Sequence, residues 1–159
     1  MFETAHIEAH SSDYETERGK PMPSKHHSFT QTNLILKIGS QYSQKYRLGS
    51  ELSLDLPERE RVPDLVIYPS MPFGEEEVKM SQIPLGVIEI LSPTQNHVDL
   101  MQKKAEYFRA GVKSYWLVFP DLRSVYVYYS VSDYEVFGQD ETLLDKVLNI
   151  EVSLPEIFS

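Results

Sequence analysis

Two carboxylates stand at positions where a buried strand usually carries apolar side chains. Glu89 lies in the middle of the apolar run GVIEIL (86–91), and Asp64 follows Pro63 at the head of PDLVIYP (63–69). Burying a lone carboxylate is costly unless a cation or strong hydrogen-bond donors compensate it. If the two strands lie side by side, Asp64 and Glu89 can point to a common spot, where a divalent cation would relieve their repulsion. The pair therefore predicts a metal site.

A lysine further along the chain would complete the chemistry. Lys103 lies one helix downstream, where its ammonium group could reach the same spot. A bound cation polarises a phosphate and lowers the pKa of a bound water, while a lysine orients the nucleophile or stabilises developing negative charge. This set of residues suits metal-assisted hydrolysis of a phosphodiester bond, in which the carboxylates hold the metal rather than attack phosphorus.

Each of these residues also has a purely structural interpretation. Glu89 could form an ion pair with a buried lysine or arginine, and Asp64 could cap a turn or the start of a strand. Asp99 and Lys103 lie four residues apart on a predicted helix, a spacing typical of a surface pair that contributes about 0.3–0.5 kcal/mol. Only the two acids upstream raise the catalytic interpretation of Lys103 above the surface pair.

Histidines and aromatic side chains are further candidates. His26 and His27 could bind a metal, although a histidine pair at the start of a helix is more often a solvated surface feature. The aromatic runs SYWLVF (114–119) and VYVYY (125–129) could stack on bases. Packing in strand cores is the better default because aromatic residues favour half-buried pleated surfaces, and Trp116 is expected in the core.

The elements that would position these residues follow from local patterns. Ser24 is placed to cap a helix over residues 26–43, and SPTQNHVDLMQKKAEYFRAG predicts a turn and a helix that ends at Gly111. The apolar stripe of the first helix comprises Phe29, Leu34, Ile35 and Ile38. Strands are expected over residues 46–56 (with a bend at Gly49), 63–69, 84–91, 114–120 and 124–130, and a last strand with a terminal turn over 146–158.

The order of these elements predicts the fold class. Strands that are apolar on both faces are usually covered on both sides. A helix, several strands, a second helix and more strands indicate an α/β (α+β) domain with a single mixed central sheet flanked by helices. Residues 1–159 are expected to form one domain, with residues 1–23 as an N-terminal arm or hairpin and residues 69–84 as a surface loop.

The composition is that of a soluble globular protein. The 159 residues are 41% hydrophobic and 25% charged, and they include no cysteine, which excludes a disulfide framework and a thiolate metal site. No basic region followed by an apolar core opens the chain, and no apolar run approaches the roughly 20 residues needed to span a bilayer. We therefore expect a cytoplasmic protein without membrane contact.

The formal charge of −9 argues against binding nucleic acid through overall charge. Acidic residues gather at 51–60, at 74–77 and from Asp140 onward. Basic residues gather elsewhere: Lys37, Lys45 and Arg47, and then Lys103, Lys104, Arg109 and Lys113. The sequence therefore still allows contact with DNA through a local basic face.

The same residues carry a resemblance to a known family. Pro63-Asp64, then Glu89 inside an apolar strand, then SP and the pattern Asp99, Lys103, Tyr107 before AGVKSYWLV resemble the restriction endonuclease family often called Uma-two-like. That family belongs to the PD-(D/E)XK nuclease superfamily. The segment YETERGKPMPSKHHS is also similar to the family's opening, so the resemblance spans nearly the whole chain and implies a restriction-endonuclease-like fold.

The resemblance also implies a set of site residues. Asp64 and Glu89 would bind Mg²⁺, with Mn²⁺ as a substitute, and the main-chain carbonyl of Ile90 would add a ligand. The superfamily's lysine would fall at Leu91, two positions after the glutamate, so the resemblance implies that it has moved to Lys103.

The remaining positions implied by the resemblance are accessory. Lys104 is the alternative to Lys103, although it points about 100° away around the helix. Glu15 and His27 match accessory polar positions in the family's opening segment, and Asp99 and Tyr107 accompany the lysine on its helix.

The implied activity is that of a Mg²⁺-dependent endodeoxyribonuclease. Cleaving two strands normally requires two active sites, so a homodimer is expected. Two alternatives stay open, because a fold does not establish an activity. One is a catalytically silent nucleic-acid or protein-binding module that keeps the nuclease fold. The other is a metal-independent structural or regulatory subunit in which Glu89 and Lys103 form a buried ion pair.

Overall fold

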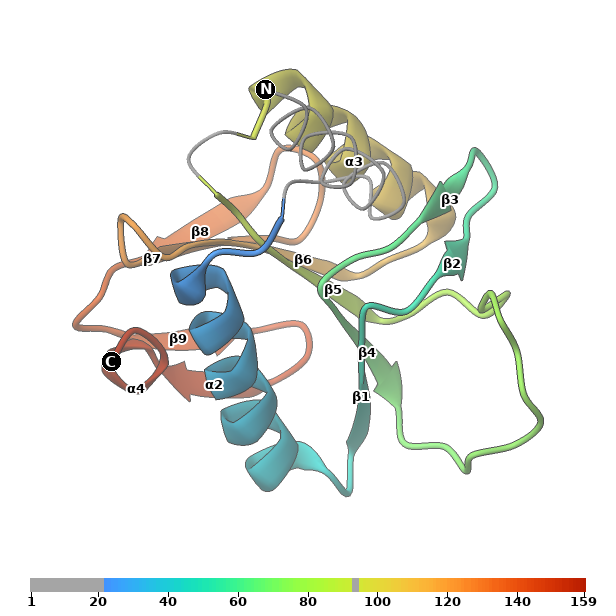
Figure 1. The fold of residues 1–159 in the computed structure, drawn as a ribbon, viewed down its shortest axis with the longest axis horizontal. Helices are drawn as coiled ribbons and strands as arrows, with labels where there is room; N and C mark the ends of the chain where they lie inside the picture. Colours follow the sequence, from blue (N-terminus) through green and yellow to red (C-terminus); the bar gives the residue numbers. More distant parts are fainter. Residues whose placement is uncertain (1–21, 93–94) are drawn as a thin grey trace, which may run out of the picture.

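The computed structural model describes residues 22–92 and 95–159 (Figure 1). Its elements are α2 (Lys25–Tyr42), β1 (Tyr46–Ser50), β2 (Leu54–Asp55), β3 (Glu60–Arg61), β4 (Leu65–Pro69), β5 (Gly86–Ile90), α3 (His97–Ala110), β6 (Ser114–Phe119), β7 (Ser124–Tyr128), β8 (Tyr134–Phe137), β9 (Thr142–Asp145), β10 (Ile150–Ser153) and α4 (Leu154–Ile157).

Six strands form the central sheet in the order β1-β4-β5-β6-β7-β8. β5 and β6 are parallel and are connected through α3, whereas every other neighbouring pair is antiparallel. Figure 1 shows α2 and α3 on opposite sides of this sheet, with the β9–β10 hairpin and α4 on the side of α2. The predicted mixed sheet flanked by helices is confirmed.

The two faces of the sheet support separate hydrophobic cores. Ile88 and Ile90 of β5 pack toward α2, whereas Val87 and Leu91 pack toward α3. Side chains alternate between faces along a strand, so Glu89 belongs to the α3 face. The strand is buried along its whole length because both faces are covered, as its apolar pattern predicts.

The first helix begins as predicted and packs differently from the prediction. The Ser24 hydroxyl accepts a hydrogen bond from the His27 N–H (3.2 Å), which caps α2. The buried face comprises His27, Thr30, Leu34 and Ile38. The placement of Phe29 in the apolar stripe was wrong, since its side chain is 59% exposed. Five positions correspond to about 140° around a helix, which turns Phe29 away from Leu34.

The second helix has both of its ends set by local sequence. The Asn96 side chain accepts a hydrogen bond from the Val98 N–H (2.7 Å), and the helix ends at Gly111 with φ +111°. That left-handed conformation favours glycine, so the predicted end of the helix is confirmed.

Other predicted boundaries differ from the structure. Gly49 lies inside β1, opposite Val66, and the chain turns instead at Glu51, whose φ is +51°. The strands β3, β8 and β9 were not predicted. Of the predicted N-terminal arm, residues 1–21 lie outside the described residues. The segment between β4 and β5 runs away from the sheet as a wide loop, as expected (Figure 1).

The β9–β10 hairpin is anchored to the sheet through one buried carboxylate. Asp145 is fully buried and accepts hydrogen bonds from the Ser114 hydroxyl and from the Trp116 indole N–H (2.8 Å). The N–H groups of Val147 and Leu148 donate to its other oxygen (3.0 and 2.9 Å). Asp145 therefore has a structural role, and Trp116 lies in the core as expected.

Within the described residues, none of the helices is both long enough and apolar enough to cross a membrane.

Candidate active site

The register between β4 and β5 brings the two predicted acids together. The ladder ends where Leu65 lies opposite Ile88, and the next residue of each segment is Asp64 and Glu89. Both side chains are almost completely buried, with exposed fractions of 0% and 1%. Two acids 25 positions apart in the chain therefore share one spot on the α3 face of the sheet.

Each carboxylate is held by the main chain of the other's strand. The Asp64 N–H donates to Glu89 Oε1 (3.3 Å), and the Ile90 N–H donates to Asp64 Oδ2 (2.7 Å). Hydrogen bonds to a carboxylate compensate part of its desolvation and fix its orientation. One oxygen of each acid is thus committed to the sheet, and the other oxygen of each faces a basic side chain.

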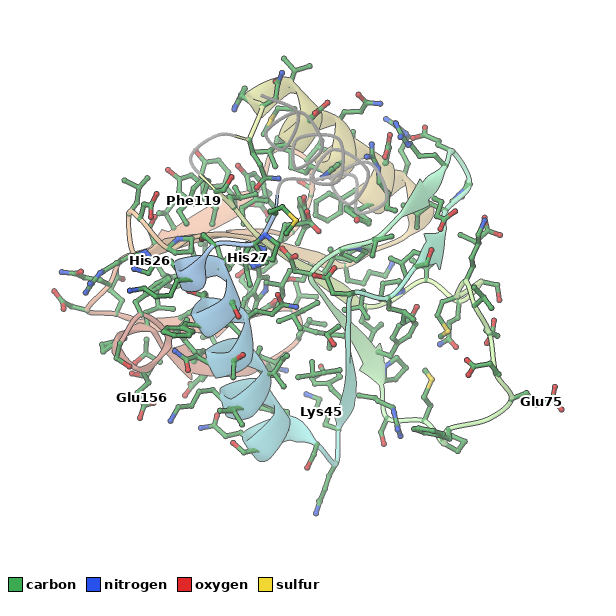
Figure 2. All side chains as sticks on the ribbon, viewed as in Figure 1. His26, His27, Lys45, Glu75, Phe119 and Glu156 are labelled. Atoms are coloured by element: carbon green, nitrogen blue, oxygen red, sulfur yellow. The ribbon has the colours of Figure 1, made fainter. Side chains whose placement is uncertain are left out.

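The side chain that faces Asp64 comes from the first turn of α2. His27 is 5% exposed, and its Nε2 lies 3.2 Å from Asp64 Oδ1. Figure 2 labels both His26 and His27 at the start of this helix. His26 is exposed, and its Nδ1 lies 3.7 Å from the exposed Asp121. The surface position that the sequence favours for the histidine pair is therefore found for His26 and not for His27. Gln31, one turn after His27, donates to the Asp64 carbonyl (3.1 Å).

The side chain that faces Glu89 is Lys103 of α3. Lys103 is buried, and its Nζ lies 3.7 Å from Glu89 Oε2. Asp99, one turn earlier, lies on the exposed first turn of the helix. Lys103 is therefore directed into the site rather than toward a surface partner, and the structure brings Asp64, Glu89 and Lys103 together.

An ion pair that the sequence did not reveal closes one side of the site. Arg61 of β3 donates two hydrogen bonds to Glu106 of α3 (2.6 and 3.0 Å), and Gln102 donates to the same carboxylate (3.2 Å). Burial raises the pKa of Glu106, but Arg61 outweighs this effect and leaves the pKa below its usual value. Arg61 precedes Asp64 by three residues and Glu106 follows Lys103 by three, so the pair joins the two segments that carry the site.

Two buried tyrosines form the wall behind Glu89. Tyr107 and Tyr115 pack against each other with ring centroids 5.3 Å apart. Burial raises the pKa of both hydroxyls well above the usual value, and the Glu89 charge raises each further. Both side chains therefore stay protonated and neutral at physiological pH. Tyr107, predicted as accessory, lies in this wall.

The oxygen atoms at the site match the ligands that a hard divalent cation prefers. If the register is continued two positions beyond the Leu65–Ile88 pair, Pro63 falls opposite Ile90, and proline has no N–H to donate to the Ile90 carbonyl. In the part of the chain that the structure describes, no three histidine or acidic side chains form a metal-binding group. Mg²⁺ is commonly held by one or two carboxylates with main-chain and water oxygens, so Asp64, Glu89 and Ile90 fit such an ion.

Lys104, the alternative to Lys103, is directed away from the two acids. Lys104 places its Nζ 4.2 Å from the centre of the Tyr128 ring, and burial lowers its pKa. Glu15 lies outside the described residues. Arg109 is bound by Glu58 through two hydrogen bonds (2.7 and 2.8 Å). Much of the predicted basic cluster on α3 is therefore buried or paired.

The arrangement of these residues can be compared with known proteins. The chain matches the model of the Uma2 family over residues 8–155, and that family is described as "Putative restriction endonuclease". The chain belongs to this family. The resemblance predicted from the site residues is therefore confirmed. Among curated proteins, none matches the Uma2 chain.

A solved structure from Anabaena variabilis ATCC 29413 is similar to this Uma2 chain. Its title describes a "putative nuclease belonging to DUF820". The two chains are 26% identical and superpose with a TM-score of 0.76, over 87% of this chain and 83% of that one. The family and this neighbour together support a nuclease-like function.

Proposed function

We propose that the protein is a metal-dependent endonuclease that hydrolyses phosphodiester bonds in DNA. The observation that carries the proposal is the convergence of Asp64 and Glu89, buried on neighbouring strands, with Lys103 Nζ 3.7 Å from Glu89. Membership of the Uma2 family and the likeness to a described nuclease add support.

The carboxylates would act as ligands. Asp64, Glu89 and the Ile90 carbonyl would hold Mg²⁺ or Mn²⁺, and the hydrogen bonds from the sheet would fix the two acids before the ion binds. When bound, the cation would polarise the phosphate and lower the pKa of a bound water. His27 would position Asp64, since its Nε2 lies 3.2 Å from Asp64 Oδ1.

Lys103 would act on the substrate. Its ammonium group cannot accept a proton, so it would donate hydrogen bonds to the attacking water or to the phosphate oxygens. Negative charge grows on those oxygens as water bonds to phosphorus and the ester bond breaks, and a buried cation stabilises that charge more strongly than one in water. Burial of Lys103 thus serves the chemistry.

Metal binding tests the shared site. We expect calorimetry with Mn²⁺ to show binding to the parent protein and loss of binding in Asp64→Asn and Glu89→Gln. Glu75→Gln is the matched control, because Glu75 is an exposed acid at the far end of the loop between β4 and β5 (Figure 2). Binding that persists in both site variants would refute a metal shared by these acids.

DNA cleavage tests the activity. Supercoiled plasmid incubated with the protein and Mg²⁺ should be nicked or linearised, and both site variants should lose this activity. The Glu75→Gln variant should cut like the parent. A parent protein that binds metal and DNA but cuts with neither Mg²⁺ nor Mn²⁺ would be a silent binding module, and the proposed activity would be wrong.

A further inference from the structure

The strand at one end of the central sheet is exposed. β8 is the last strand in the sheet order, so among the described residues no strand pairs with it on the side away from β7. Its Tyr134 and Val136 are 49% and 46% exposed. Natural edge strands avoid pairing with another strand by being very short, by charged side chains (lysine above all), by proline or by a bulge. β8 is short, with four residues, and carries one charge, Glu135. The sequence YEVF has no lysine or proline, and its register with β7 is continuous.

The main chain of β8 offers hydrogen bonds on its outer side. The Tyr129 N–H donates to the Asp133 carbonyl (2.8 Å) where the β7–β8 ladder begins. Hydrogen-bonded pairs alternate along an antiparallel ladder, so residues 133, 135 and 137 bond to β7. Tyr134 and Val136 consequently direct their N–H and C=O groups away from β7. Another extended strand can form hydrogen bonds with these outward N–H and C=O groups.

The charge at this edge is compensated within the chain. Glu135 is the one charged residue of β8; the Tyr129 hydroxyl donates to it (2.7 Å), and Lys146 Nζ lies 3.9 Å away. Leu144 and Val147, on either side of Lys146, are 42% and 45% exposed. With Glu135 compensated in this way, the exposed acid that remains beside β8 is Asp133, which lies before the strand rather than within it. The strand itself therefore presents mainly apolar side chains, which two copies can share without strong repulsion.

We propose that β8 pairs in antiparallel fashion with β8 of a second copy, so that the two sheets join across a two-fold axis. An antiparallel pair of identical strands is symmetric about such an axis, and the same edge supplies all the donors and acceptors. A register centred on Glu135 would place two carboxylates opposite each other. A register centred on Val136 avoids this repulsion, since it places Glu135 opposite Phe137 of the partner subunit.

Cysteine cross-linking tests the register. The chain has no cysteine, so Val136→Cys introduces a single thiol. Opposed residues of a hydrogen-bonded pair lie about 5.5 Å apart between Cα atoms, which falls within the range of disulfides. We expect oxidation to convert Val136→Cys into a covalent dimer. Leu122→Cys is the matched control, because Leu122 lies on the turn between β6 and β7 and is 73% exposed. This variant should stay largely monomeric on denaturing gels.

Sedimentation of the unmodified protein tests the association itself, without nucleic acid, so its outcome is independent of the proposed activity. We expect a dimer with a dissociation constant on the order of micromolar, as suits a small interface. Val136→Lys should be monomeric with an unchanged melting temperature, whereas Leu122→Lys should dimerise like the parent. A parent that stays monomeric, a dimer that survives Val136→Lys, or open-ended growth through pairing of β8 with β1 would each overturn the proposal.

Discussion

Adjacent lysines on α3 have different environments. Lys103 is directed to Glu89, whereas Lys104 stacks over the Tyr128 ring. One position corresponds to about 100° around a helix, which is enough to separate a buried ion pair from a contact with the sheet's outer strands. Both lysine side chains are equally buried, so their exposed fractions do not distinguish them. The two side chains differ in the direction in which they point.

The two lysines allow a matched comparison. We expect Lys103→Ala to lower the rate constant for DNA cleavage by about 10²-fold or more, because a preorganised cation that stabilises developing charge is typically worth that much. Lys104→Ala should cut at nearly the parent rate. Single-turnover cleavage with saturating Mg²⁺ measures both, and calorimetry with Mn²⁺ checks that each variant still binds metal. Equal rates for the two variants would show that Lys103 has no part in the chemistry.

Several elements must meet to build the site. The β4–β5 ladder aligns the two acids, α2 adds His27, and α3 adds Lys103. The Arg61–Glu106 pair joins β3 to α3 and is largely buried, with side chains 12% and 3% exposed, whereas the pair of Arg109 with Glu58 on the same helix is exposed. Removing one partner would leave the other charge uncompensated, which destabilises the fold. The pair therefore stabilises the packing of α3 against β3.

The Arg61–Glu106 pair predicts a pH dependence of stability. Because the pKa of Glu106 is lower in the folded protein than in the unfolded chain, the ionised carboxylate stabilises the fold above the unfolded pKa of about 4.3. This contribution is lost as pH falls through the folded pKa. We expect Glu106→Gln to lower the free energy of unfolding by about 1.5–3 kcal/mol at pH 7, with the difference from the parent shrinking toward pH 3.

Urea unfolding at several pH values measures this effect. Glu58→Gln removes the same chemical group from the exposed pair and should change stability far less, since water screens it. An equal loss in both variants, or a loss from Glu106→Gln that does not depend on pH, would contradict the stabilising role of the buried pair.

Local sequence patterns predict some of these elements and not others. Glu89 could be assigned to a face because successive side chains of any strand point to opposite faces. The end of α3 could be placed at Gly111 because glycine favours a left-handed cap. Arg61 and Glu106 lie 45 positions apart, and no periodicity links them. β8 was missed because its four residues are all at least partly exposed and show no buried alternation. Contacts set by tertiary packing were therefore beyond sequence reasoning.

The molecule as a whole is acidic, and two buried acids lie at its proposed active site. The net charge is −9, and several of the basic residues on α3 are buried or paired. Phosphate and two carboxylates repel one another unless a cation lies between them. Affinity for DNA is therefore expected to depend on the bound metal more than on the protein's own basic side chains.

Removing the metal should reveal this repulsion. In the presence of a chelator we expect the parent to bind DNA weakly, and Glu89→Gln to bind about tenfold more tightly because one close negative charge is gone. Glu75→Gln changes the net charge equally but far from the site, and should bind like the parent. Fluorescence anisotropy with a labelled duplex at fixed salt measures all three. Equal gains in both variants would indicate that net charge alone governs binding.

The loop from Pro69 to Gly86 has a consequence for how relatives are recognised. Pairing of β4 with β5 sets the distance between the two acids, and the connection that links these strands extends outward into solvent (Figure 1). Residues can accordingly be inserted or deleted in that connection while the distance between the two acids stays constant. We therefore expect the number of positions between the proline–aspartate step and the glutamate to vary among homologues. A search pattern with a fixed gap would discard genuine members that a variable gap retains.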